Sequence, residues 1–249
     1  MQSLRTIDDW GAPVAAAGVA HADGVVATHG PRDEPVRWAS VTKLLTGLAA
    51  LVAVEEGALE LDERLRRLLS HAGDRRRTYS NEGFEEVARL VGEAAGMPFE
   101  EYLREAVLAP LRLRGSLQGS PASEYVGPLD DLLALAQELL APRLIAQETL
   151  AEATAVAFPG LAGVLPGWGR QEPNDWGLAF ELKDGKAPHW MGALTSPRAF
   201  GHFGQSGTFL WVDPELGAAC AVLTTREFGD WAKAAWPAFS DSVVREQRA

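Results

Sequence analysis

A serine and a lysine that could act together stand three residues apart, at Ser40 and Lys43. They open an apolar run, residues 44–54, which contains no proline and is followed by two glutamates and Gly57. This pattern predicts a helix that is apolar on nearly every side and therefore buried. Residues three apart share a helix face, so we expect Lys43 to reach the Ser40 hydroxyl. A buried lysine loses its proton more easily, which would let Lys43 activate Ser40 as a nucleophile. The alternative is structural: Ser40 only caps a core helix.

A tyrosine and an asparagine, Tyr79 and Asn81, follow a basic turn and precede a predicted helix, residues 82–95. A nearby ammonium group lowers the pKa of a tyrosine, which suits Tyr79 to act as a base. The amide of Asn81 donates and accepts at once, so it could hold a substrate amide or Lys43. The structural alternative is a turn tyrosine followed by an asparagine that caps the helix.

A glycine-rich stretch, residues 201–208, leads into a short apolar segment that ends in the turn signal Asp213-Pro214. Glycines just before a strand allow the backbone to approach a ligand closely. A backbone N–H group at that strand edge could stabilise an oxyanion. The alternative is a glycine-rich bend with a surface histidine, His202.

Together and in this order, the three motifs resemble those of the serine β-lactamase and penicillin-binding protein superfamily. That family carries S-x-x-K, then Y-x-N, then K-T-G or H-x-G on a strand, and the third triplet here is His-Phe-Gly. The resemblance is nearest to the class C-like branch, which includes esterases and D,D-peptidases. It covers most of residues 10–246, because the flanking segments also look like family pieces: residues 37–39, 57–63, 68–73 and 99–111.

The resemblance implies catalysis through an acyl-enzyme, with Ser40 as the nucleophile. Lys43 and Tyr79 would share the role of base, and whichever is neutral would take the proton. Asn81 would orient Lys43 or the substrate. The mechanism needs no metal ion and no organic cofactor.

The resemblance also implies a substrate-binding set around the third motif. The backbone N–H groups of Ser40 and Gln205 would form the oxyanion hole, and His202 would line the site and polarise Tyr79. The remaining members of this set are Phe203, Gly204 and Ser206.

The third triplet departs from the pattern that binds β-lactams. Relatives use a cation and a hydroxyl residue to hold the β-lactam carboxylate, and here His202 and Phe203 take those positions. A phenyl ring forms no side-chain hydrogen bond, and a histidine is mostly neutral near pH 7. Ser206 and Thr208 are candidates to compensate.

The segment from His71 to Tyr79 is shorter than its counterpart in relatives, so we expect a site that is more open on one side. It contains three arginines, residues 75–77. We expect a solvated charge run there; the alternative is that these arginines attract an acidic substrate to Tyr79.

Composition limits the partners. The net charge of −11 over 249 residues argues against nucleic acid and against an anionic membrane as a partner. Cys220 is the single cysteine, in an apolar run, and is expected to be a buried strand thiol. The histidines outside the motifs have no metal-ligand spacing and are expected at the surface or in loops: His21, His29 and His189. The first residues lack an apolar signal segment, and no run of 18 apolar residues occurs, so we expect a cytoplasmic protein.

The elements predict an α/β fold of the β-lactamase type, in one domain that spans residues 1–249. An antiparallel sheet built from N- and C-terminal strands is flanked by helices, with an inserted all-α lobe. The α/β lobe comprises residues 1–39 and 176–249, and the helical lobe comprises residues 40–175. Strands are expected at residues 14–19, 24–28, 176–182, around Trp190, at 208–212 and 218–224, and the last helix at 230–247.

The Gly/Pro-rich stretch at residues 158–175 is a long loop, and such loops are usually functional or mobile. Trp168 and Trp176 could wall an apolar acyl pocket. Equally, they could only pin the loop to the core.

These observations predict a serine acyl hydrolase that acts on a small ester or amide. A β-lactamase or a D,D-peptidase is the alternative within the enzyme class. A ligand-binding module without catalytic activity, on the same fold, is the alternative outside it.

The third triplet generates a testable prediction on selectivity. A neutral imidazole and a phenyl ring cannot replace two charge-assisted hydrogen bonds, each worth ~1.5–3 kcal/mol. Penicillin or cephalosporin turnover should therefore lie at least ~10²-fold below that of a short neutral ester. The double change His202→Lys, Phe203→Thr should narrow this gap. Nitrocefin turnover as fast as that of p-nitrophenyl acetate by the unchanged protein would refute the prediction.

Overall fold

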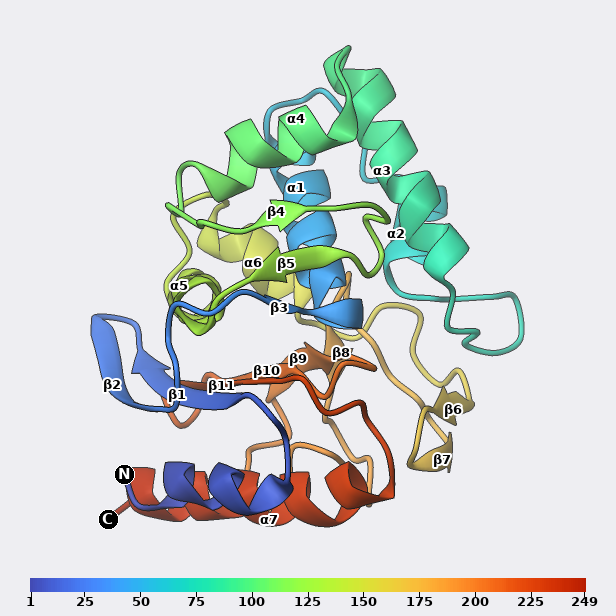
Figure 1. Cartoon of the computed structure of the whole chain (residues 1–249). Helices are drawn as coiled ribbons and strands as arrows, with labels where there is room; N and C mark the ends of the chain where they lie inside the picture. Colours follow the sequence, from blue (N-terminus) through green and yellow to red (C-terminus); the bar gives the residue numbers. More distant parts are fainter.

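The computed structural model describes residues 1–249. Six antiparallel strands form the main sheet in the order β2-β1-β11-β10-β9-β8, which is seen nearly edge-on in Figure 1. Their bounds are β1 (Ala15–His21), β2 (Gly24–His29), β8 (Glu181–Leu182), β9 (Phe200–Phe203), β10 (Phe209–Asp213) and β11 (Ala218–Thr224). Strand β1 pairs with β11, so Ala15 lies opposite Thr224. The two ends of the chain therefore build one sheet, as the sequence predicts.

The main sheet separates two hydrophobic clusters, and β11 is buried on both faces. Successive side chains of a strand point to opposite faces. Ala221 accordingly packs into the larger cluster under the inserted helices, and Cys220 into the smaller one. Helix α7 (Asp230–Gln247) and the 3₁₀ helix η1 (Ser3–Trp10) cover the smaller cluster (Figure 1). Cys220 is thus the buried thiol that was predicted, and burial raises its pKa.

Helix α1 (Thr42–Glu55) runs through the larger cluster, and its residues 42–53 are all buried. The apolar run in the sequence predicts this burial. Gly47 allows the helix to approach Ala179 closely, because a Cβ atom at Gly47 would lie 2.1 Å from the Ala179 Cβ. Packing on every side fixes α1, and it fixes the first helical turn as well.

The inserted segment contains helices and also short strands. The helices are α2 (Glu63–Leu69), α3 (Asn81–Ala95), α4 (Phe99–Leu103), the π-helical turn η3 (Arg104–Leu108), α5 (Leu129–Leu140) and α6 (Gln147–Ala153). Strand β5 (Tyr125–Gly127) pairs on one side with β3 (Val36–Arg37) and on the other with β4 (Ser116–Leu117). Strands β6 (Gly163–Leu165) and β7 (Gly169–Gln171) form a separate hairpin. Helical periodicity alone does not reveal strands as short as these. The lobe boundaries proposed from the sequence stay a prediction.

Three local predictions were wrong. The strand expected at residues 176–182 is limited to β8, Glu181–Leu182. No strand forms around Trp190: its side chain is fully buried in a loop and donates an indole hydrogen bond to Glu181 (2.6 Å), which accounts for the apolar signal. The stretch at residues 158–175 has its own structure, because it contains the β6–β7 hairpin.

No helix combines the length and the apolar character that crossing a membrane requires.

Candidate active site

The turn that carries Ser40 is held by the small sheet. Trp38 donates its backbone N–H and its indole N–H to carbonyl groups of β5, at 2.9 and 3.1 Å. Ala39 then adopts a φ of +48°, a left-handed conformation that residues with side chains rarely take. Such strain persists only where the surroundings impose it. The chain turns here into the 3₁₀ helix η2 (Ala39–Val41), and Ser40 is half-buried at its centre.

Lys43 lies in the first turn of α1 with a fully buried side chain. Its Nζ donates hydrogen bonds to Asn81 Oδ1 (2.6 Å) and to the Ala122 carbonyl (2.9 Å). Burial lowers the pKa of Lys43 to about 7, although the charge of Glu85 acts in the opposite direction. A large fraction of Lys43 is therefore neutral near pH 7 and can accept a proton.

Tyr79 lies beside this lysine, with its ring centroid 4.8 Å from Lys43 Nζ. Its hydroxyl is buried and forms no well-aligned hydrogen bond, although Ser40 is near enough to favour the ionised form. Burial outweighs that effect and raises the pKa of Tyr79. The lowered pKa of Tyr79 that the nearby ammonium group predicted was wrong, because the apolar surroundings of the hydroxyl have the larger effect.

His202 lies on β9 and is fully enclosed. Its Nδ1 donates to the Phe203 carbonyl (2.7 Å), so the other nitrogen of the neutral ring is an acceptor. Burial, and next the nearby charge of Lys43, lower the pKa of His202 to about 3. His202 is therefore neutral at pH 7, and its ring lies 6.0 Å from that of Tyr79.

Gly204 brings the end of β9 against the Ser40 turn. A Cβ atom at Gly204 would lie 2.4 Å from the Trp38 carbonyl oxygen and 3.1 Å from the Ser40 nitrogen. Only glycine fits there, which gives a steric reason for the glycine of the His-Phe-Gly triplet. The backbone N–H groups of Ser40 and of Gln205, the next residue, donate to no protein group. Ser40 and Gln205 line the same cavity, so their N–H groups stay the candidates for an oxyanion hole.

Of Phe203, Ser206 and Thr208, only Phe203 lines the cavity at Ser40. Phe203 packs against Trp168 and Phe228, with ring centroids 5.5 and 5.2 Å away, and also borders the cavity at Ser40. The hydroxyls of Ser206 and Thr208 are buried without hydrogen-bond partners, and neither residue lines that cavity.

A cavity of about 110 Å³ opens beside Ser40. Its walls are mostly aromatic and aliphatic, and nine residues line it: Ser40, Tyr79, Leu165, Pro166, Trp176, Glu181, His202, Phe203 and Gln205. Of the two tryptophans that the sequence singled out, Trp176 lines the cavity. Trp168 instead pins the β6–β7 hairpin to the aromatic cluster around Trp236, 6.2 Å away.

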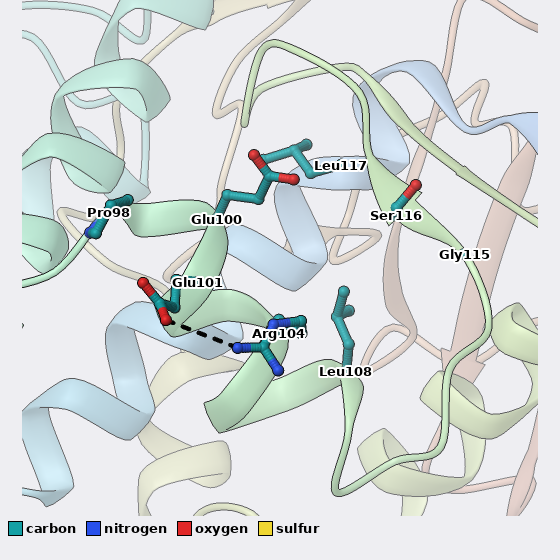
Figure 2. A pocket seen from close by; sticks show the side chains of 8 residues that line it. All are labelled: Pro98, Glu100, Glu101, Arg104, Leu108, Gly115, Ser116 and Leu117. Carbon is teal, nitrogen blue, oxygen red and sulfur yellow. Dashed lines mark ion pairs between the residues drawn. The ribbon is translucent and has the colours of Figure 1, made fainter.

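A larger pocket of about 320 Å³ lies in the inserted segment, between α4 and β4 (Figure 2). It presents Glu100, Glu101 and Arg104, and the last two form an ion pair at 3.8 Å. Ser116 is its one hydroxyl, with no lysine, histidine or tyrosine among the lining residues. The pocket therefore lacks the nucleophile and base that the Ser40 cavity combines.

Glu181 was not predicted to be a site residue, and the burial of its neighbour His189 was not predicted either. The Glu181 carboxylate is fully buried beside the cavity and accepts hydrogen bonds from Lys186, His189 and Trp190. Burial disfavours its charge, but these donors outweigh burial, so its pKa lies below the usual value. His189 is thus a core residue, contrary to expectation. An acidic residue between Phe180 and Leu182, in an otherwise apolar segment, was the available signal.

Arg77 is buried, so the predicted solvated charge run is wrong at this position. Its guanidinium donates to the carbonyls of Ser70, Ala157 and Phe158. Arg75 and Arg76 are exposed, as expected. Arg77 therefore ties the start of the segment that carries β6 and β7 to the loop before Tyr79.

Comparison with known proteins places this geometry in a family. The sequence profile of the family described as Beta-lactamase matches residues 5–76 and 66–243. A protein from Mycobacterium bovis described as a beta-lactamase is 44% identical; the match covers 99% of this chain and 100% of that one, with a TM-score of 0.96. A comparison with curated protein sequences gave no match.

Two more distant structures share the fold. A LovD9 mutant of simvastatin synthase from Aspergillus terreus is 15% identical, with 99% and 98% of the chains covered and a TM-score of 0.80. A D-stereospecific amidohydrolase from Streptomyces is 18% identical, with 93% and 95% covered and a TM-score of 0.70. The family match over most of the chain and the 44% identity to a full-length relative agree, and the chain belongs to the β-lactamase family of serine hydrolases.

Proposed function

We propose that this protein is a serine acyl hydrolase that forms an acyl-enzyme on Ser40 from a small ester or amide. The observation that carries the proposal is the state of Lys43. It is buried, its pKa is lowered to about 7, and it lies one helical turn from Ser40. A lysine in that state can accept a proton near neutral pH, which a solvated lysine cannot do.

In the proposed mechanism, the Ser40 hydroxyl oxygen attacks the substrate carbonyl carbon and its proton passes to the pair formed by Lys43 and Tyr79. Burial raises the pKa of Tyr79, so this phenol keeps its own proton at pH 7. Lys43, whose pKa is about 7, is the member of the pair that can be neutral and take the serine proton. The N–H groups of Ser40 and Gln205 stabilise the oxyanion. The pair then returns the proton to the leaving group, and water later releases the acyl group.

Asn81 and Ala122 provide the orientation that this step needs. Each accepts a hydrogen bond from Lys43 Nζ, and a lysine with two fixed acceptors has one direction left for its third group. In the neutral amine that direction is open to the lone pair. Positioning of this kind supplies much of the advantage of a bound base over one in solution.

The cavity favours a short, uncharged acyl group. Its volume is small, and Leu165, Trp176 and Phe203 make it largely apolar. The neutral ring of His202 offers a hydrogen-bond acceptor at the position where β-lactam-binding relatives have a cation. These features support an ester or amide over a carboxylate-bearing lactam.

Two other functions remain as candidates. A β-lactamase or D,D-peptidase activity is favoured by the 44% identical Mycobacterium bovis protein, which is described as a beta-lactamase. A binding module without catalysis is possible on any enzyme fold. Covalent labelling separates the three functions. An esterase should be labelled by a fluorophosphonate but not by a penicillin, and a β-lactam-recognising enzyme should be labelled by both reagents. A binding module should be labelled by neither reagent.

The nucleophile gives the most direct test of the proposal. Ser40→Ala should abolish fluorophosphonate labelling and lower the hydrolysis of short p-nitrophenyl esters by at least ~10³-fold, since no other group can form the acyl-enzyme. Intact-mass analysis and steady-state kinetics measure both. Ser116→Ala, in the larger pocket of Figure 2, is the matched control and should change neither. Full turnover by purified Ser40→Ala would exclude the proposal.

The lowered pKa of Lys43 predicts the pH dependence of the rate. Below pH 7 the lysine gains a proton and cannot act as a base, so kcat/KM should fall about tenfold per pH unit there. Lys43→Met should remove this dependence and cost ~10²–10⁴-fold in rate. Lys233→Met, at an exposed ion pair with Asp230, should retain it. A rate that stays constant from about pH 5 to about pH 9 would contradict the role of Lys43.

A further inference from the structure

His71 holds the chain on both sides of Tyr79. Its backbone carbonyl accepts a hydrogen bond from the Thr78 N–H (3.0 Å), and its ring nitrogen Nδ1 accepts one from the Ser80 N–H (3.2 Å). One residue thus binds the backbone immediately before and immediately after Tyr79. The His71 ring also packs on the Tyr79 ring, with centroids 4.6 Å apart.

The same contacts fix the start of α3. Ser80 is the N-cap of this helix, and its hydroxyl accepts a hydrogen bond from the Gly83 N–H (3.0 Å). Asn81, the first helical residue, accepts the hydrogen bond from Lys43. The hydrogen bond between His71 and Ser80 therefore helps to position both Tyr79 and Asn81, the residue that accepts a hydrogen bond from Lys43.

The backbone and the ring of His71 are both tightly constrained by their surroundings. Its φ of +57° is left-handed, which is a strained conformation for a residue with a ring. Its ring is enclosed by Tyr79, Phe84 and Trp176, with centroids 4.6, 5.3 and 4.8 Å away. Because a backbone N–H donates to Nδ1, the neutral ring must carry its proton on Nε2, which is buried without a partner. Burial keeps the pKa of His71 well below its usual value, which preserves this form.

We propose that His71 is a positioning residue that sets the geometry of Tyr79 and Asn81 through its two hydrogen bonds to the backbone around Tyr79. The proposal rests on the proposed hydrolase function, because that function assigns roles to Tyr79 and Asn81. No contact of His71 with Ser40 or with substrate is invoked. Loss of the Nδ1 acceptor would leave the Ser80 N–H unpaired and free the Tyr79 segment to shift.

Two substitutions separate the acceptor from the ring. His71→Phe keeps an aromatic ring but removes the acceptor, and His71→Asn keeps an acceptor near the position of Nδ1 and tolerates a left-handed φ. We expect His71→Phe to lower kcat for a short ester by about 10–10²-fold with KM changed less than about threefold, the scale of a small misplacement of catalytic groups. His71→Asn should recover most of kcat. His29→Phe, on the edge strand β2, is the control and should keep full activity.

A double-mutant cycle tests whether His71 acts through Tyr79. In a Tyr79→Phe background, His71→Phe should cost less than about twofold further in kcat, because the group it positions is already absent. The same loss in both backgrounds, or a loss that follows only the folded fraction, would mean a purely structural role and would overturn the proposal.

If His71→Phe does not fold, or if the protein hydrolyses no ester, NMR spectra still test whether His71 accepts the hydrogen bond from Ser80. In ¹⁵N NMR spectra of the unchanged protein, His71 should be neutral at pH 7 with its proton on Nε2, and the Ser80 amide should exchange slowly. A protonated Nδ1, or a rapidly exchanging Ser80 amide, would refute the positioning contact itself. Absence of Ser40 labelling with this NMR signature intact would instead refute the hydrolase function alone.

Discussion

The burial of one ammonium group organises this molecule. Lys43 enters the core because α1 is apolar on every side, and its Nζ can stay there only because Asn81 and the Ala122 carbonyl accept its hydrogen bonds. These acceptors come from α3 and from the loop before β5, so a single amine joins three separate parts of the inserted segment. The cost of burying charge is what lowers the pKa of the amine, and the same packing that stabilises the fold thereby prepares a base.

The rest of the site depends on how closely the sheet approaches this helix. Gly204 lets the chain at the end of β9 touch the strained turn at Ala39 and Ser40, and the next residue, Gln205, lines the same cavity as Ser40. The sheet can be placed so accurately because its strands come from both ends of the chain and pack on both faces. On the side of α3, the hydrogen bond from the Ser80 N–H to His71 holds the segment that carries Tyr79.

Much of this arrangement is predictable from local patterns, and the rest depends on tertiary surroundings. The apolar run after Lys43 predicts a buried helix, and the hairpin at β1 and β2 follows from alternation and a turn signal. The raised pKa of Tyr79 and the burial of Arg77 were missed, because they depend on tertiary surroundings such as the Ala157 carbonyl that accepts from Arg77. The carboxylate of Glu181 was missed because its donors come from a loop that folds back on it without any regular periodicity. The strand predicted around Trp190 was wrong for a different reason. A large apolar residue indicates burial, but it cannot by itself distinguish a strand from a loop whose side chain is buried.

Lys43 is central to the proposed chemistry because its lowered pKa of about 7 leaves about half of it neutral at pH 7, and NMR titration of the lysine side chains tests this directly. The chain has only four lysines, at positions 43, 183, 186 and 233, so the spectra are simple and Lys43→Met assigns the signal. The Lys43 signal should titrate with a pKa of about 7. A Lys43 side chain that stays protonated to above about pH 9, as an ordinary solvated lysine does, would contradict it.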